Sequence, residues 1–138
     1  MLAYEFCQWL QVKGFGVVGT SIFDNFQPES PDNCICVYDT QPPALPESSS
    51  LSVDNFGIQV LTRNSIKEDA RELLTNIHLA FIGFGGEKLV PTSIFIVTET
   101  SIDTSPYGIG KDDKGRHEYS VNYILRTQSF NNDYRLWL

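Results

Sequence analysis

Two aspartates and a lysine have the residue types of a metal-dependent catalytic site. Asp32 follows a proline, and Asp112 lies two residues before Lys114. Paired carboxylates of this kind can hold magnesium while a lysine positions the attacking water. That chemistry needs the second aspartate and the lysine on a central strand, whereas Asp112 and Lys114 lie in a charged, glycine-flanked segment typical of an exposed turn. We therefore expect no metal site here.

The cysteines and histidines also lack the spacing of a catalytic or zinc site. Cys7, Cys34 and Cys36 include no CxxC pair, and Cys34 and Cys36 would project from the same face of a strand without the reach of a normal disulfide. His78 lies at the border of a helical apolar stripe, where a hydrogen-bonded structural role is the ordinary one, and His117 opens a strand beside charged neighbours. We expect three reduced thiols, no catalytic residue and no metal ligand.

The glycine-rich segments are wrongly placed to bind a phosphate group. Residues 83–86 follow a helix, and residues 108–110 precede a strand. A phosphate-binding loop must precede a helix, because the free N–H groups at the helix start meet the anion. The sequence therefore predicts no nucleotide cofactor.

The chain of 138 residues is acidic, with 10 Lys plus Arg, 17 Asp plus Glu and a formal net charge of −7. Proteins that coat duplex nucleic acid or anionic membranes need clustered basic residues, so both classes are excluded. Lys13 is the one basic residue before Arg63, so we expect an acidic face from the first half of the chain. No apolar run approaches the roughly 20 residues of a membrane span, and the start lacks the features of a signal peptide, so we expect a soluble, non-secreted protein.

Apolar periodicity predicts the order helix, three strands, helix, two strands. Leu2, Phe6, Trp9 and Leu10 recur at the spacing of an amphipathic helix, and Gly14 is placed to end it. Alternating or continuous apolar runs predict the strands. The predicted strands are 15–23, 34–38, 56–62, 93–99 and 117–127.

The second helix has the clearest signature in the sequence. Ser65 followed by Glu68 predicts a capping box, in which each side chain satisfies a free N–H at the helix start. An apolar stripe then runs along one face up to Phe81. The stripe consists of Ile66, Ala70, Leu73, Leu74, Ile77 and Phe81.

These elements predict an α+β fold, with a mostly antiparallel sheet and two helices packed on one face. The length predicts a single domain over 1–138, since domains average about 150 residues. Two long loops are expected at 41–53, which is rich in proline and serine, and at 103–115, which ends in a charged turn. A C-terminal tail is expected over 129–138.

The two loops and the tail are the candidate contact segments. Long loops in compact domains are often functional, and an apolar chain end is usually bound to a surface. A flexible surface connection is the alternative reading of the proline-rich loop. The candidate residues for subunit or partner contacts are Pro42, Pro43, Pro46, Tyr107, Lys111, Arg116 and Trp137.

The later half of the chain resembles the minor capsid or tail terminator proteins of tailed bacteriophages. The resemblance rests on a strand ending at Arg63, the helix 65–81, a strand over 94–97, and a glycine, basic and acidic turn within 106–123 that leads into an aromatic-rich final strand. Residues 34–39, which run into the proline-rich loop, are similar to the family's early part. The segment after Thr127 has no match in the pattern.

The resemblance implies a structural virion protein with a tail-terminator-like fold and no enzymatic activity. Such proteins assemble as hexameric rings at the neck of the virion, cap the tail tube and form the head–tail joining surface. The implied partners are further copies of the chain, the tail tube protein and a head-side connector or neck protein, with assembly in the host cytoplasm. DNA would pass through the lumen without specific binding, and no catalytic residue or cofactor is carried over.

Two other functions stay open at this point. A head-completion or neck adaptor protein of the same virion would differ by contacting portal-side protein instead of tube protein. A small enzyme or ligand-binding domain would differ by a concave pocket with converging polar groups.

Overall fold

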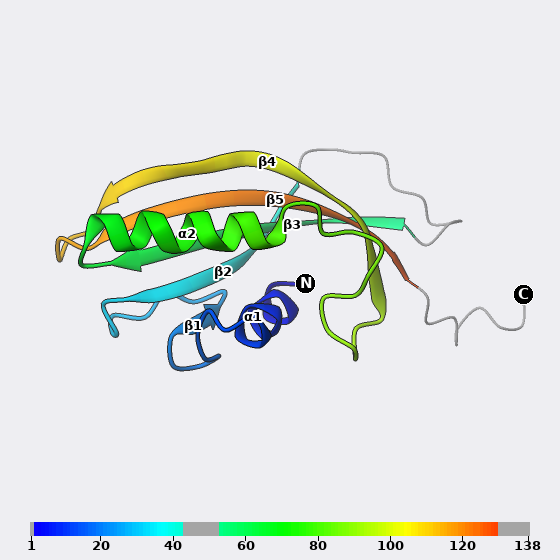
Figure 1. Cartoon of the computed structure of the whole chain (residues 1–138), viewed down its shortest axis with the longest axis horizontal. Coiled ribbons are helices and arrows are strands. Elements are labelled where there is room, and N and C mark those ends of the chain that lie inside the picture. The colour runs from blue at the N-terminus through cyan, green and yellow to red at the C-terminus, as the bar shows by residue number, and fades with distance from the viewer. Residues whose placement is uncertain (1, 43–52, 130–138) are drawn as a thin grey trace, which may run out of the picture.

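The computed structural model describes residues 2–42 and 53–129 (Figure 1). The elements are α1 (Ala3–Val12), β1 (Ile22–Asp24), β2 (Cys34–Thr40), β3 (Val53–Asn64), α2 (Lys67–Phe81), β4 (Phe95–Lys111) and β5 (His117–Ser129). This is the order of helices and strands that the periodicity predicts. The loop predicted over 41–53 lies outside the described residues except at its two ends, and so does the tail predicted over 129–138 except for Ser129.

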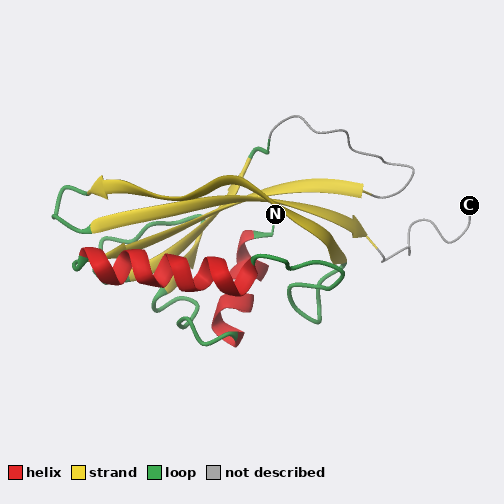
Figure 2. Cartoon of the chain, turned by 45° about the horizontal axis from the view of Figure 1, so that its top comes forward, coloured by secondary structure: helices red, strands yellow, loops and turns green. Residues whose placement is uncertain are grey.

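The five strands form one sheet in the order β1-β2-β3-β5-β4. β1 is parallel to β2, and the other neighbouring pairs are antiparallel. Both helices lie on the same face of the sheet (Figure 2). The α+β class, with a mostly antiparallel sheet covered by two helices on one face, is therefore confirmed.

Alternation along the two central strands creates the main core. Ile58 and Val60 of β3 and Val121 and Tyr123 of β5 are at most 1% exposed and face the helices. Their sequence neighbours point to the opposite face, because successive side chains of a strand alternate. The alternation predicted for 56–62 and 117–127 is confirmed.

Aromatic rings join the two helices to the sheet at the centre of this core. Phe81 of α2 lies 4.8 Å from Phe6 of α1, 5.2 Å from Trp9 and 4.9 Å from Tyr123 of β5, measured between ring centroids. Edge-to-face contacts of this kind add stability beyond the burial of their surface. Phe81 therefore links α1, α2 and β5.

The histidine at the border of the α2 stripe has the structural role that the sequence predicts. His78 Nδ1 lies 2.7 Å from the Tyr123 hydroxyl, and the two rings stack. Burial lowers the pKa of His78 and raises the pKa of Tyr123. The tyrosine thus keeps its proton, the neutral form of the imidazole is favoured, and one hydrogen bond joins the two side chains.

The strand predicted over 15–23 is wrong for most of its length. Only residues 22–24 pair continuously with β2, and residues 17–21 form a tight turn in which Ser21 and Ile22 N–H groups donate to the Val17 carbonyl. Gly19 has φ +86°, a left-handed conformation that interrupts an extended chain. Phe15 and Val18 of this segment pack against the core from a loop, and Val17 is exposed.

The prediction of a capping box at the start of α2 is also wrong. The helix begins at Lys67 after an extended Ile66, and no side chain caps it. The Ile66 N–H instead donates a hydrogen bond to Asn64 Oδ1, and the Ser65 N–H donates one to Asn33 Oδ1. Ile66 is 53% exposed, so the buried stripe starts at Ala70 and continues through Leu74, Ile77 and Phe81.

The largest difference from the sequence prediction lies in β4, which covers 95–111 where the sequence predicts a strand over 93–99 and a loop over 103–115. Residues 102–111 pair with β5, so only 112–116 form a turn. Glycine, proline and aspartate locally disfavour a strand, but the register with β5 decides the outcome. Pro106 is tolerated because β4 lies at the sheet edge, where a missing N–H breaks no internal ladder.

The expected common face of Cys34 and Cys36 is confirmed. Their sulfur atoms lie 3.8 Å apart on the sheet face opposite the helices, where both side chains pack with Leu61 in a second small core. These two and Cys7 are free and buried. Burial raises the pKa of Cys7 to about 12, with further contributions from Asp24 and Asp39.

Truncating the shared aromatic ring tests this description of the core. We expect Phe81→Ala to lower the free energy of unfolding by about 3–5 kcal/mol, since it leaves a cavity among three packed rings. Leu79→Ala on the same helix is the matched control, because Leu79 is 63% exposed; it should change stability by no more than about 0.5 kcal/mol. Urea unfolding measures both, and equal losses would contradict the description.

Candidate functional site

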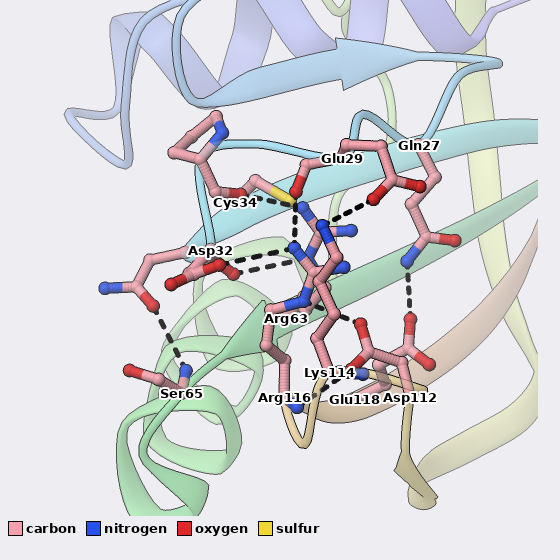
Figure 3. Close-up of polar contacts among 12 residues, drawn as sticks. Gln27, Glu29, Asp32, Cys34, Arg63, Ser65, Asp112, Lys114, Arg116 and Glu118 are labelled. Atoms are coloured by element: carbon pink, nitrogen blue, oxygen red, sulfur yellow. Dashed lines mark hydrogen bonds and ion pairs between the residues drawn. The ribbon is translucent and has the colours of Figure 1, made fainter.

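A buried arginine holds the turn between β4 and β5. The Arg116 side chain is 7% exposed, and its Nε lies 2.7 Å from Asp112 Oδ2. Its Nη1 reaches across to the Glu29 carbonyl and lies 3.4 Å from Asp32 Oδ1 (Figure 3). The turn is therefore tied to a segment more than 80 residues earlier in the chain.

A second arginine, Arg63 near the end of β3, contacts the same early segment at Pro31 and Asp32. Arg63 is 2% exposed, and its guanidinium donates to the carbonyls of Pro31 and Asp32 at 2.7 and 3.2 Å. A buried guanidinium needs such partners, because leaving its donors unsatisfied costs more than the hydrogen bonds contribute. Together, Arg63 and Arg116 hold the segment 29–32 against the sheet.

Asp112 organises the turn itself. Its Oδ1 accepts hydrogen bonds from the Lys114 and Arg116 N–H groups, at 3.0 and 2.9 Å. Burial acts to raise the pKa of Asp112, but the hydrogen bonds and charge of Arg116 and the Lys114 N–H outweigh it, so the pKa lies below its ordinary value. Lys114 adds an exposed ion pair with Glu29 at 2.7 Å.

These contacts explain why the aspartates and the lysine with the metal-site pattern do not assemble one. Asp32 and Asp112 do approach the same place, but Arg116 lies between them. Among residues 2–42 and 53–129, no group of three His, Cys, Asp or Glu side chains is placed to hold a metal ion. The carboxylates at this turn bind arginine and backbone N–H groups.

The structure places the predicted contact residues in different settings. Tyr107 and Lys111 are exposed on β4, and Pro42 is half-buried just after β2. Arg116 is buried, and the contacts described above hold its guanidinium to the turn, so it acts as a positioning residue. Pro43, Pro46 and Trp137 lie outside the described residues.

Sequence reasoning missed Arg63, Asp112 and Asn25 as organising residues. A signal existed for Arg63, since it follows Val60, Leu61 and Thr62 in an apolar strand. A buried arginine in such a strand needs hydrogen-bond partners within the protein. The partners of Asp112 are local, at Lys114 and Arg116 in the charged turn that the sequence predicts. Asn25 donates to Asp39 Oδ2 and accepts from the Asp39 N–H; this pairing depends on the fold, and no local pattern identifies it.

The outer edge of β4 is a long edge of the sheet. Its first part is covered, because Gly86 N–H donates to the Val97 carbonyl and Val97 N–H donates to the Glu87 carbonyl. Every residue of 101–111 is exposed, including Ile102, Tyr107 and Ile109 at 42–47%. Within residues 2–42 and 53–129 no strand pairs with this outer edge over 102–111. A strand edge of this kind with apolar side chains is a surface to which another protein chain can bind.

None of the helices in the described part of the chain is both long enough and apolar enough to cross a membrane.

The fold and these surfaces define a small α+β protein with an exposed sheet edge and an internally braced hairpin. The sequence model of a family described as "Bacteriophage tail terminator protein" matches residues 9–129. The match covers most of the chain, so the chain belongs to the bacteriophage tail terminator family, and its role is structural, as a component of the phage tail. No curated protein matches the chain. The family predicted from the sequence is thus confirmed.

The turn should respond to acid through Asp112. Because its folded pKa is depressed, the stability that it contributes is present above its ordinary pKa of 3.8 and is lost as the pH falls through the lower, folded value. We expect Asp112→Asn to be less stable than the wild type at about pH 7, with the difference shrinking towards about pH 3. Urea midpoints across this range measure it.

Asp113→Asn is the matched control for this experiment. Asp113 is exposed in the same turn and forms no hydrogen bond or ion pair with the described parts of the chain. Its substitution should leave the pH profile of the wild type unchanged. A constant difference between Asp112→Asn and the wild type at every pH would contradict the role given to Asp112.

Proposed function

We propose that this chain is a tail terminator that assembles into a ring, caps the tail tube and forms the surface to which the head joins. The observation that carries the proposal is the family match over residues 9–129. The ring has six copies, as the resemblance of the sequence to long-tailed phage terminators implies. Further copies of the chain, the tail tube protein and a head-side connector or neck protein are its partners.

The form of the sheet supports assembly into a ring. Identical copies close into a ring when each presents two different surfaces that fit one another. β1 and β4 lie at opposite edges of one sheet. β1 has 3 residues and packs beside α1, whereas β4 has 17 residues and an exposed outer edge, so the two edges differ as a ring requires.

The charge of the chain supports a lumen through which DNA passes without specific binding. The formal net charge of −7 repels phosphate at the distances of a channel. The ring lies at the neck, at the top of the tail, and is assembled in the host cytoplasm. This function uses no cofactor and no catalytic residue.

The contact segments proposed from the sequence keep that role here. The proline-rich residues Pro42, Pro43 and Pro46 belong to an arm that contacts a neighbouring copy, and Trp137 contacts a copy or a partner. Tyr107 and Lys111 contribute from the exposed part of β4. Arg116 contributes indirectly, by holding the turn that ends β4.

Native mass spectrometry with and without tail tube protein tests the proposal. We expect a closed oligomer of six copies, formed either alone or on the tube protein, and tubes of defined length when the chain is added during their polymerisation. Tubes that grow on unhindered would overturn the capping role. Binding to portal-side protein without binding to tube protein would indicate a neck adaptor instead.

Deleting residues 42–50 tests the proline-rich arm separately. We expect the shortened chain to fold with an unchanged circular dichroism spectrum, because β2 and β3 would still be joined by a short connection, and to lose oligomer in proportion to the lost contacts. Native mass measures the oligomer. An unchanged oligomer mass and dissociation would show that this arm makes no contact between copies.

A further inference from the structure

The last part of β4 combines an exposed strand edge with a groove. Residues 107–111 follow Pro106 and are all exposed, and none of the described strands pairs with their outer side. The groove has a volume of about 350 Å³ and is lined by Ile109, Lys111 and Tyr119, among others. Lys67, the first residue of α2, lines it as well, so the groove lies on the face of the sheet that the helices cover.

The groove suits a large aromatic side chain. A Cβ at Gly108 would come 3.2 Å from Tyr119 Cε1, so the tyrosine ring lies directly against the β4 backbone. This ring and Ile109, which is 47% exposed, contribute apolar surface, and Lys67 and Lys111 are exposed cations that attract the face of an aromatic ring. When an extended segment adds to a strand edge, main-chain hydrogen bonds supply affinity and a neighbouring pocket supplies specificity.

The opposite edge of the sheet cannot supply the added strand. β1 has 3 residues, and both backbone groups of Ile22 are already bonded to the preceding turn. The Ile22 N–H donates to the Val17 carbonyl, and the Ile22 carbonyl accepts the Gly19 N–H. Pairing between the β4 edges of two copies would join like with like, which makes a dimer and stops instead of closing a larger ring.

Among the segments outside the described residues, 130–138 has the composition of an added strand. It contains no proline, and residues 134–138 read Tyr-Arg-Leu-Trp-Leu, which are residue types with large side chains that a strand edge can pack. The segment 43–52 contains two prolines, which lack the N–H that a ladder needs, and it joins β2 to β3, so it is fixed at both ends. The tail therefore fits the edge better than the proline-rich arm does.

The tail is too short to reach the groove of its own copy. β5 runs from His117, which pairs with Lys111, to Ser129, after which the tail begins. The 12 steps from 117 to 129 cover about 40 Å, whereas the nine residues 130–138 span at most about 32 Å. Figure 1 shows the end of β5 at the opposite end of the molecule from the β4–β5 turn. A tail that occupies this groove therefore comes from another copy.

We infer that residues 134–138 of one copy add a short strand to residues 107–111 of the next copy, with Trp137 seated in the groove against Ile109 and Tyr119. This inference rests on the proposed ring and names the contact that closes it. The contact joins unlike surfaces at opposite ends of each copy, so it repeats from copy to copy until the ring closes.

Two variants that disable opposite partners of the contact test the inference. We expect Trp137→Arg, which removes the inserted ring, and Ile109→Glu, which blocks the groove, each to weaken assembly by about tenfold or more, because a buried aromatic anchor carries much of the energy of an interface. Native mass spectrometry and analytical ultracentrifugation measure assembly. At a concentration where the wild type is dissociated, both variants should melt at the wild-type temperature, since the contact lies between copies.

Mixing the two variants gives a readout that only a contact between copies produces. An Ile109→Glu copy keeps an intact tail, and a Trp137→Arg copy keeps an intact groove, so one of each forms a single contact and then stops. Above the concentration at which the wild type assembles, we expect a pair with one copy of each variant in the mixture. Each variant alone should stay as single copies.

Leu79→Glu is the matched control for Ile109→Glu. It introduces the same charge at another exposed apolar residue, and Leu79 lies on α2 outside the groove. It should assemble as the wild type does.

The outcomes separate this inference from the proposed function. Formation of the mixed pair supports the contact. Wild-type rings together with unaffected single variants, or with variants that form no pair when mixed, overturn the contact and leave the ring in place. A lower melting temperature of dissociated Trp137→Arg would assign the tail to its own copy and overturn the contact as well. A wild type that stays as single copies even with tube protein overturns the ring itself, and the contact with it.

Discussion

Uninterrupted pairing between β3 and β5 is the constraint on which the rest of the structure depends. The ladder runs from Val53 opposite Gln128 to Asn64 opposite His117 without a register shift. One face of this pair supplies Val60 and Tyr123 to the core under the helices, and the other supplies Arg63 to the polar cluster. A slip of one residue would exchange the two faces, since side chains alternate along a strand. Both helices, the second core and the braced hairpin therefore take their positions from one register.

The parts of the fold that the sequence predicts are those in which local periodicity and long-range packing agree. The α2 stripe and the alternation of β3 and β5 read directly from residue types, because burial on one face enforces the pattern. β4 could not be read in this way. Its Gly108, Gly110 and Pro106 indicate a loop locally. The segment forms a strand because it pairs with β5. The start of α2 also depends on residues outside the local pattern. Asn33 and Asn64, which lie outside the helix, accept the hydrogen bonds there in place of the predicted capping box.

The candidate site shows the same division between local and distant information. A charged turn over 112–116 is evident from composition, but the use of Arg116 as an internal brace depends on Glu29 and Asp32, which the fold brings from far along the chain. Membership of the tail terminator family gives the structural role. The buried side chains of Arg63 and Arg116 fix the hairpin to the segment 29–32, and the hairpin carries the exposed edge of β4.

The broken edge of β4 has a consequence for colloidal behaviour. An open strand that is long, flat and apolar templates fibrils, because each added chain recreates the same free edge. β4 departs from this form at four register shifts, and Pro106 removes an N–H from its exposed part. A foreign strand can therefore align with only a few residues before the match fails. These irregularities therefore disfavour amyloid-like stacking along this edge.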